Sequence, residues 1–324
     1  MNNLNIDLHC DLLYYLLRAD TKLDDKELGC SLPFLKEGNV RLQTMAIYAP
    51  TSKNSCFLAL QQSEIFGKLI EDSNFFHFNL NNYDDLENRS RVGILASIEN
   101  ASCFCEENSP LNKGFENLEK IIQNTKKLFY ISLTHHDENR FGGGNNSEAG
   151  LKPDGKVLID YLNEKKIAID LAHTSDQLAY DILNYIDQRN YKISVLASHS
   201  NFRTIYKNNR NLPDELVNEM IARKGLIGLN FIRDYIDVEH PERFYEHIQQ
   251  GLYLGAGDNM AYGADFFFDK NHPDKSRYPF FFKDFENATA YNSINNRLNE
   301  EFSSEIMEKI SHKNALDFIK RLWT

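Results

Sequence analysis

Short apolar runs alternate with amphipathic stretches from the first residues of the chain to the last, and few folds accommodate such an order. Eight of the runs have the length and composition of buried strands, and helical patterns separate them. The predicted strands are Asn5–Leu8, Val40–Tyr48, Val92–Ile98, Leu128–Leu133, Ala168–Leu171, Ile193–Ala197, Leu226–Asn230 and Met260–Gly263. Strands that alternate with helices predict an α/β fold, and eight such units predict a (β/α)8 barrel of the TIM type.

Three of the helical segments carry recognisable ends. Ser175 is placed to cap a helix with apolar residues along one face. Pro213-Asp214-Glu215 opens a second helix, which Gly225 ends. From Ser304 onward the apolar spacing predicts one closing helix.

The length of 324 residues is compatible with two domains or with one large barrel. Because the alternation continues to the C-terminus, we expect one barrel domain over residues 1–324. The 36 basic and 47 acidic residues give a net charge of −11, which argues against nucleic acid or an anionic membrane as the main partner.

The cysteines and the apolar content predict the compartment. Five cysteines, an odd number within the first third of the chain, are expected to be reduced thiols. The first residues show no secretory signal, and no run approaches the ~18 apolar residues of a membrane span. We therefore expect a cytoplasmic protein without a membrane anchor.

In barrels of this type, the catalytic groups stand at the carboxyl ends of the strands. Six of the eight predicted strands are followed there by a potential metal ligand or acid–base group, and the seventh strand by Asn230. The six sets are His9 with Asp11, Glu99, His135 with His136, His173, His199 and Asp265. A single histidine at a strand end is usually a hydrogen-bonded structural residue, but that explanation does not extend easily to six ends.

The spacing His9-x-Asp11 places two ligands on one side of an extended chain, where both can reach the same ion. Imidazole and carboxylate suit Zn²⁺ or a similar divalent metal, although a solvent-exposed polar strand end gives the same pattern. His173 and His199 could form a second site. Glu99 could bridge two ions ~3.5–4 Å apart, or it could cap the element that begins at Asn100.

Taken in order, these and neighbouring motifs resemble the membrane dipeptidase (renal dipeptidase) family of zinc metallopeptidases over nearly the whole chain. The stretch Asn209-Arg210-Asn211-Leu212-Pro213-Asp214-Glu215 is the most specific of them. The others are Asp7-Leu8-His9-Cys10-Asp11-Leu12, Leu133-Thr134-His135, Ile169-Asp170-Leu171-Ala172-His173-Thr174-Ser175, Ala197-Ser198-His199-Ser200-Asn201, Gly228-Leu229-Asn230-Phe231 and Gly263-Ala264-Asp265-Phe266.

The resemblance implies a role for each matching position. Two zinc ions per chain are expected, one held by His9 and Asp11 and the other by His173 and His199, with Glu99 as the bridge. His135 would stabilise the oxyanion of the tetrahedral intermediate, and Asp265 would be the acid–base carboxylate that faces the substrate amine. Arg210, assisted by Tyr235, would pair with the C-terminal carboxylate of a dipeptide. His77, His136, His240, His247, His272 and His312 are interpreted as structural or surface residues.

The chemistry of the residue types agrees with these roles. Two metal ions generate a hydroxide near neutral pH and polarise the amide carbonyl. A guanidinium accommodates a carboxylate through two parallel hydrogen bonds, and a carboxylate that holds no metal can carry a proton to the leaving amine. Without the resemblance, however, Arg210 would be interpreted as a solvated cation at a helix entry and Tyr235 as a packing residue.

Three features depart from the family pattern. The loop Asp137–Gly150 is rich in Gly and Asn, and His199 follows His173 at a distance of 26 positions. Asp265 is followed by Phe266-Phe267-Phe268, where the family usually has another acidic residue and a glycine. The Phe run could line an apolar side-chain pocket, but packing in the seam between barrel and helices is the favoured interpretation. These features affect the expected substrate preference more than metal binding. The polar stretch Asp269–Arg277 is expected to be a long loop on the functional rim.

The sequence leaves three functional hypotheses. The favoured one is a zinc dipeptidase with a small dipeptide substrate. The first alternative is a related metal-dependent amidohydrolase that acts on an N-acyl amino acid, a lactam or a cyclic amide. The second is a non-catalytic barrel, which the retention of Asp265 beside a full ligand set disfavours. By analogy with other barrel enzymes, a homodimer is expected.

Overall fold

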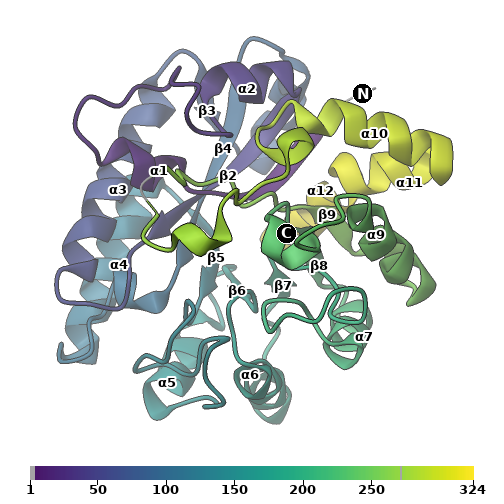
Figure 1. Cartoon of the computed structure of the whole chain (residues 1–324). Coiled ribbons are helices and arrows are strands. Elements are labelled where there is room, and N and C mark those ends of the chain that lie inside the picture. Colours follow the sequence, from purple (N-terminus) through teal and green to yellow (C-terminus); the bar gives the residue numbers. More distant parts are fainter. Residues whose placement is uncertain (1–3, 271) are drawn as a thin grey trace.

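The structure is a computed structural model that describes residues 4–270 and 272–324; residues 1–3 of the predicted domain and residue 271 of the predicted polar loop lie outside the described residues. Eight parallel strands form a closed barrel, which confirms the predicted fold class, and the helices surround it (Figure 1). These strands are β1 (Asn5–Cys10), β2 (Val40–Tyr48), β4 (Val92–Glu99), β5 (Leu128–Ser132), β6 (Ala168–Asp170), β7 (Val195–Ala197), β8 (Leu226–Leu229) and β9 (Met260–Tyr262).

Closure follows from three pairings. β1 pairs with both β2 and β9, while β2 pairs along seven residues with β4, so that the ring runs from β1 through β9 without an open edge. A ninth strand, β3 (Phe75–His77), pairs with Val92–Ile94 of β4 and was not predicted from the sequence. Three residues are too few for a periodic pattern, and only the edge of β4 defines this strand.

The helices begin close to the predicted positions. The Ser175 side chain accepts a hydrogen bond from the Leu178 amide and caps α6, and α7 begins directly after Pro213. The predicted closing helix is instead interrupted by a π-helical turn at Lys309–Lys313, and Ser303 caps its first part. The α-helices are α1 (Leu12–Leu16), α2 (Leu32–Glu37), α3 (Ser55–Glu71), α4 (Leu111–Thr125), α5 (Pro153–Leu162), α6 (Asp176–Gln188), α7 (Asp214–Ala222), α8 (Arg233–Ile236), α9 (Arg243–Tyr253), α10 (Ala290–Glu301), α11 (Ser304–Glu308) and α12 (Asn314–Trp323).

The apolar core has two parts. One fills the space between the strands and the surrounding helices, and the other fills the barrel interior beneath α12. Trp323 of α12 packs edge-on against Phe129, and Lys127, immediately before β5, lies over the Trp323 ring. Because α12 covers the amino ends of the strands, the opposite end of the barrel is the one left for chemistry.

Asp7 fixes the carboxyl end of β1. Its buried carboxylate accepts hydrogen bonds from the His9 amide (3.0 Å), Gln43 Nε2 (2.7 Å), the Ala264 amide (2.8 Å) and Tyr291 Oη (2.7 Å). One side chain thereby joins β1 to β2, to the segment after β9 and to α10. The residues that follow β1 and β9 are therefore held side by side.

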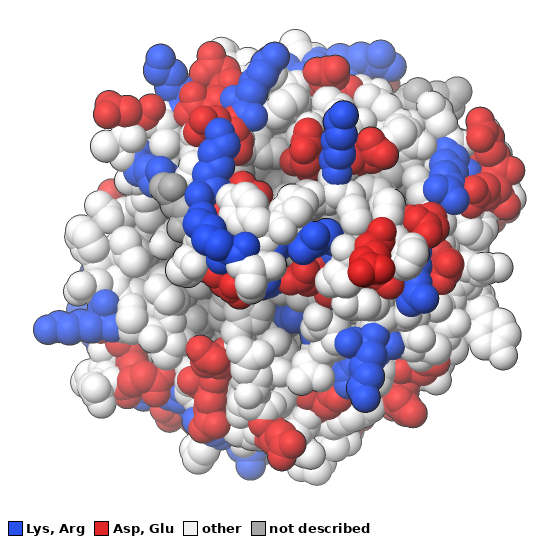
Figure 2. Space-filling view, viewed as in Figure 1, with Lys and Arg blue, Asp and Glu red and all other residues white. Residues whose placement is uncertain are grey.

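The face in Figure 2, viewed as in Figure 1, shows acidic and basic side chains interspersed around its rim rather than one field of a single sign. All five cysteines are free thiols, as predicted. Among the described helices, none is both long and apolar enough to cross a membrane.

Candidate metal centre and active site

The predicted metal ligands converge on Glu99, the last residue of β4. Its Oε1 lies 2.9 Å from His173 Nε2 and 3.3 Å from His199 Nε2, and its Oε2 lies 3.6 Å from His9 Nε2. All four side chains are buried. Three imidazoles from β1 and from the segments after β6 and β7 thus meet one carboxylate inside the barrel mouth. Glu99 does not cap the next element, because the Asn100 side chain does so by accepting from the Ser102 amide.

Asp11 and Asp265 stand on the His9 side of this cluster. The side chains of His9, Asp11 and Asp265 each offer a ligand atom within 4.8 Å of the other two. Backbone hydrogen bonds from the Asp265 amide to the His9 carbonyl and from the Asp11 amide to the Phe266 carbonyl hold the two segments together. Asn230 Nδ2 donates to Asp265 Oδ2 at 3.0 Å and orients that carboxylate.

The hydrogen bonds of Tyr130 determine the tautomer of His9. Tyr130 Oη donates to the Leu8 carbonyl, which can only accept, and it also lies 2.8 Å from His9 Nδ1. Since the phenol has one hydrogen, His9 Nδ1 must be the donor of the second bond. His9 Nε2 then presents a lone pair toward Glu99, and it has no hydrogen-bond partner among the described residues.

His199 is oriented by a second, independent relay. The Asp170 carboxylate accepts from the Ala172 and Ser198 amides and from the Ser132 and Ser198 hydroxyls. Because the Ser198 hydrogen is given to Asp170, Ser198 Oγ accepts from His199 Nδ1 at 2.6 Å. The lone pair of His199 Nε2 therefore also points into the cluster, 2.9 Å from His173 Nε2.

These orientations fit a divalent cation. Buried lone pairs that face a carboxylate and one another repel unless a cation lies between them, and neutral imidazole with carboxylate is the donor set that zinc accepts. Asp11 Oδ1 is also buried and has no hydrogen-bond partner in the described part of the chain.

Close backbone packing beneath the site explains two of its glycines. A Cβ on Gly228 would lie 1.8 Å from the Ser198 carbonyl oxygen, and one on Gly263 would lie 2.0 Å from the same atom. Both contacts would displace the segment that carries Ser198 and His199. The motifs Gly228-Leu229-Asn230 and Gly263-Ala264-Asp265 therefore need glycine at their first position.

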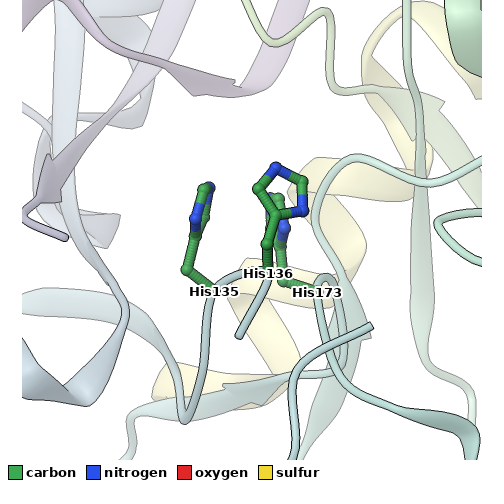
Figure 3. A group of neighbouring side chains, drawn as sticks. All are labelled: His135, His136 and His173. Carbon is green, nitrogen blue, oxygen red and sulfur yellow. The ribbon is translucent and has the colours of Figure 1, made fainter. Parts of the chain in front are cut away.

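His135, His136 and His173 stand beside one another at the wall of the site (Figure 3). The ring centroid of His135 lies 4.1 Å from that of His136 and 4.2 Å from that of His173. Burial lowers the pKa of His135 to about 3 and that of His136 to about 4, so both imidazoles are neutral near pH 7. His135 Nε2 is 3.9 Å from Glu99 Oε1.

Arg210 lies next to the backbone of His199 and is only 4% exposed. Its Nη2 donates to the His199 carbonyl at 3.0 Å, and its guanidinium lies 5.2 Å from the centroid of the Tyr235 ring. Arg210 Nε has no hydrogen-bond partner, and no carboxylate within the described ranges forms an ion pair with this guanidinium. A buried cation without an ion-pair partner is costly, and an anionic ligand would offset that cost.

A cavity of about 140 Å³ opens above Glu99, and six of the side chains that line it were not assigned to the site from the sequence. These are Tyr48, His136, Ile232, Phe267, His272 and Arg277. His136 and His272 were interpreted as structural or surface residues; both instead face this cavity. The position of His136 directly after His135 was a sequence signal that could have assigned it to the site. Arg277 donates to Tyr235 Oη at 3.3 Å, but it lies in a segment whose sequence contains no motif that could have identified it.

Comparison with known sequences agrees with this arrangement. The profile of the membrane dipeptidase family, peptidase family M19, matches residues 2–322. The chain belongs to this family. The resemblance inferred from the motifs is thereby confirmed.

Curated relatives of this M19 chain align over part of their length. The dipeptidase verJ of Clonostachys rogersoniana is 30% identical over 148 residues, which cover 42% of this chain and 36% of the relative. The dipeptidase tcpJ of Claviceps purpurea is 25% identical over 209 residues, covering 60% and 44%. The chain spans less than half the length of these curated relatives.

Solved structures match the M19 fold almost completely. A metallopeptidase of Rhodobacter sphaeroides, bound to a phosphinate mimic of L-Ala-D-Ala, superimposes with a TM-score of 0.81 at 18% identity over 98% of this chain and 99% of that one. An amidohydrolase of Pseudomonas aeruginosa gives 0.75 at 16% identity over 99% and 97%. At sequence identities of 16–18%, the similarity to these structures shows that the fold is shared.

Proposed function

We propose that this protein is a zinc-dependent dipeptidase. The observation that carries the proposal is the buried Arg210 guanidinium, which has no carboxylate partner in the described part of the chain and stands beside a cluster of imidazole lone pairs. A site with one fixed cation and one metal centre suits a small amide that ends in a free carboxylate. The structurally similar R. sphaeroides metallopeptidase binds a mimic of a dipeptide, which supports the same substrate class.

In this proposal His9 and Asp11 would hold one zinc ion, His173 and His199 would hold a second, and Glu99 would serve both. When bound, the metal would lower the pKa of water and polarise the scissile carbonyl. Arg210 pairs with the substrate carboxylate, and Tyr235, held between Arg210 and Arg277, closes that end of the site.

Two further side chains manage charge during the reaction. Neutral His135 donates a hydrogen bond to the oxygen that becomes negative when the carbonyl is attacked. Burial raises the pKa of Asp265 to about 6, so its carboxylate can take up a proton near neutral pH and deliver it to the leaving amine. In the substrate complex, Asp265 also faces the free amino group of the dipeptide.

The test is metal analysis combined with a substrate panel. Protein purified with added zinc is expected to contain two equivalents and to cleave dipeptides but not tripeptides, because a longer peptide moves its charged end out of reach of Arg210. The Asp265→Asn variant is expected to keep its zinc and to lose cleavage. Absence of zinc together with intact dipeptides would contradict the proposal.

The same panel separates the related amidohydrolase hypothesis. N-acetyl amino acids keep the carboxylate for Arg210 but lack the amino group that Asp265 faces. Faster cleavage of N-acetyl amino acids than of dipeptides would favour the amidohydrolase. A single catalytic domain over residues 1–324, a homodimer and a cytoplasmic location stay predictions.

A further inference from the structure

A second cavity, of about 570 Å³, opens directly beside the metal centre. It shares the lining residues Asp11, Tyr48, Phe267 and His272 with the smaller cavity above Glu99, so the two cavities are adjacent. The smaller space, about 140 Å³, has room for a reacting amide but not for a large side chain beside it. The larger one falls within the roughly 300–1,000 Å³ of small-molecule sites.

The walls of this second cavity are mainly aromatic. On one side Tyr14 packs against Tyr48, with ring centroids 5.4 Å apart. The Tyr48 ring also lies 4.8 Å from the ring of His135, which lines the smaller cavity. On the other side Phe267 packs against His272 at 6.1 Å. We call the space bounded by Tyr14, Tyr48, Leu58, Phe267, Phe268 and His272 the aromatic side pocket.

The Phe run after Asp265 thus divides between two roles. Phe266 is fully buried and packs against Tyr291, as the favoured interpretation of the sequence expected. Phe267 and Phe268 instead line the aromatic side pocket. The ring of Phe268 is held in place between the Arg18 guanidinium, 4.2 Å from its centroid, and the Tyr15 ring at 5.1 Å.

The barrel order decides which end of a substrate this pocket meets. Arg210 lies in the segment that follows β7, and in the ring of eight strands β7 stands opposite β2. The aromatic side pocket is lined by Asp11, which directly follows β1, and by Tyr48, the last residue of β2. A dipeptide whose carboxylate pairs with Arg210 therefore extends its amino-terminal residue toward this pocket.

We propose that the aromatic side pocket binds the side chain of the amino-terminal residue and that the protein prefers dipeptides with a large aromatic residue at that position. The inference rests on the proposed dipeptidase function. Aromatic rings gain from offset and edge-to-face contacts with Tyr14, Tyr48 and Phe267 beyond their burial of apolar area, whereas a methyl side chain would leave most of the pocket unfilled.

The wild-type enzyme tests this without any substitution. The value of kcat/KM for Phe-Ala is expected to exceed that for Ala-Ala at least tenfold, and Ala-Phe is expected to show no comparable gain. Equal values, or faster cleavage of Ala-Ala, would overturn the inference while leaving the dipeptidase function intact. Failure to cleave any dipeptide would overturn the dipeptidase function and the inference with it.

Two substitutions change the pocket in opposite ways. Phe268→Ala removes part of its wall and is expected to lower the ratio of kcat/KM for Phe-Ala over Ala-Ala, mainly through KM for Phe-Ala. Leu58→Trp fills the space from α3 and is expected to lower the same ratio by steric exclusion. Tyr253→Ala on α9, an aromatic residue that is 84% exposed, is the matched control and should leave the ratio unchanged. An unchanged ratio in both pocket variants would contradict the assignment.

Discussion

At the level of single residues, the neighbours of His9 and His199 fix which ring nitrogen carries the hydrogen. Tyr130 accepts from one ring and Ser198 from the other, and each leaves Nε2 free to bind a cation. Partners of this kind orient metal ligands and raise their basicity. Ser198 and Tyr130 are therefore positioning residues for the metal centre, although neither touches it.

Ser198→Ala is expected to weaken zinc binding about 10- to 100-fold, because His199 loses the acceptor that fixes its tautomer. Chelator competition measures the dissociation constant directly. Ser132→Ala is the matched control, since Ser132 also donates to Asp170 Oδ2 but touches no imidazole. If both variants lose zinc affinity equally, Asp170 stabilises the strands and the relay through Ser198 has no separate effect.

Arg210→Ala is expected to lower kcat/KM for a dipeptide by ~2–4 kcal/mol, the cost of unpairing a buried charged contact. This corresponds to about 30- to 700-fold. A dipeptide amide, which lacks the carboxylate, should be an equally poor substrate for the wild-type enzyme and for the variant. A variant that still discriminates between acid and amide would show that another cation, such as Arg277, binds the carboxylate.

At the level of elements, the sequence was sufficient to predict the eight barrel strands and the residues that follow them. Apolar runs bounded by polar groups mark a strand end, and barrel closure brings all such ends together. The same reasoning could not predict that Arg277 and His272 belong to the site. Both lie in the stretch Asp269–Arg277, which has no periodicity that fixes where a side chain points. β3 and the π-helical turn in the closing helix depend on contacts with β4 and with the barrel, which a local pattern does not contain.

His247 links three elements and gives the fold a dependence on pH. This buried residue of α9 accepts at Nδ1 from the Phe202 amide and donates at Nε2 to the Ile236 carbonyl. Burial lowers the pKa of His247 from 6.5 to about 4. Between pH 6.5 and pH 4, His247 binds a proton in the unfolded chain but stays neutral in the folded chain. The contribution of neutral His247 to stability is therefore present above pH 6.5 and is lost as the pH falls toward 4.

The free energy of unfolding should therefore fall by up to ~1.4 kcal/mol per pH unit through His247 alone over that interval. Urea denaturation of zinc-free protein from pH 7 to pH 4 measures the slope. His247→Gln, which retains a donor and an acceptor, is expected to have a shallower slope than wild type. The exposed His240→Gln is the control and should retain the wild-type slope; identical slopes in all three proteins would exclude His247 as a source.

At the level of the whole molecule, the barrel mouth concentrates three carboxylates in a small buried volume. Asp11, Glu99 and Asp265 surround His9, and no Lys or Arg in the described part of the chain forms an ion pair with any of them. Burial and the neighbouring Glu99 raise the pKa of Asp11 well above its usual value. Such a cluster works against folding unless a cation neutralises it.

Zinc should therefore stabilise the entire barrel. At a free concentration of a thousand times Kd, a bound ion adds ~4 kcal/mol to the free energy of unfolding, and for a chain of this size each kcal/mol raises Tm by roughly 2 °C. Removal of zinc by a chelator is expected to lower Tm by several degrees, and replacement of zinc should restore it. Differential scanning calorimetry at two zinc concentrations measures both effects.

The Asp11→Asn variant tests whether Asp11 is a metal ligand or a structural carboxylate. Without zinc it should be at least as stable as wild type, because one of the mutually repelling carboxylates is gone, and with zinc it should gain less. A structural role for Asp11 predicts the opposite: lower Tm without zinc and no dependence on the metal in either protein. Only a cation-binding cluster stabilises the barrel when zinc is bound and destabilises it when zinc is absent. The Tm values with and without zinc, compared between wild type and Asp11→Asn, therefore distinguish a metal centre from a polar network.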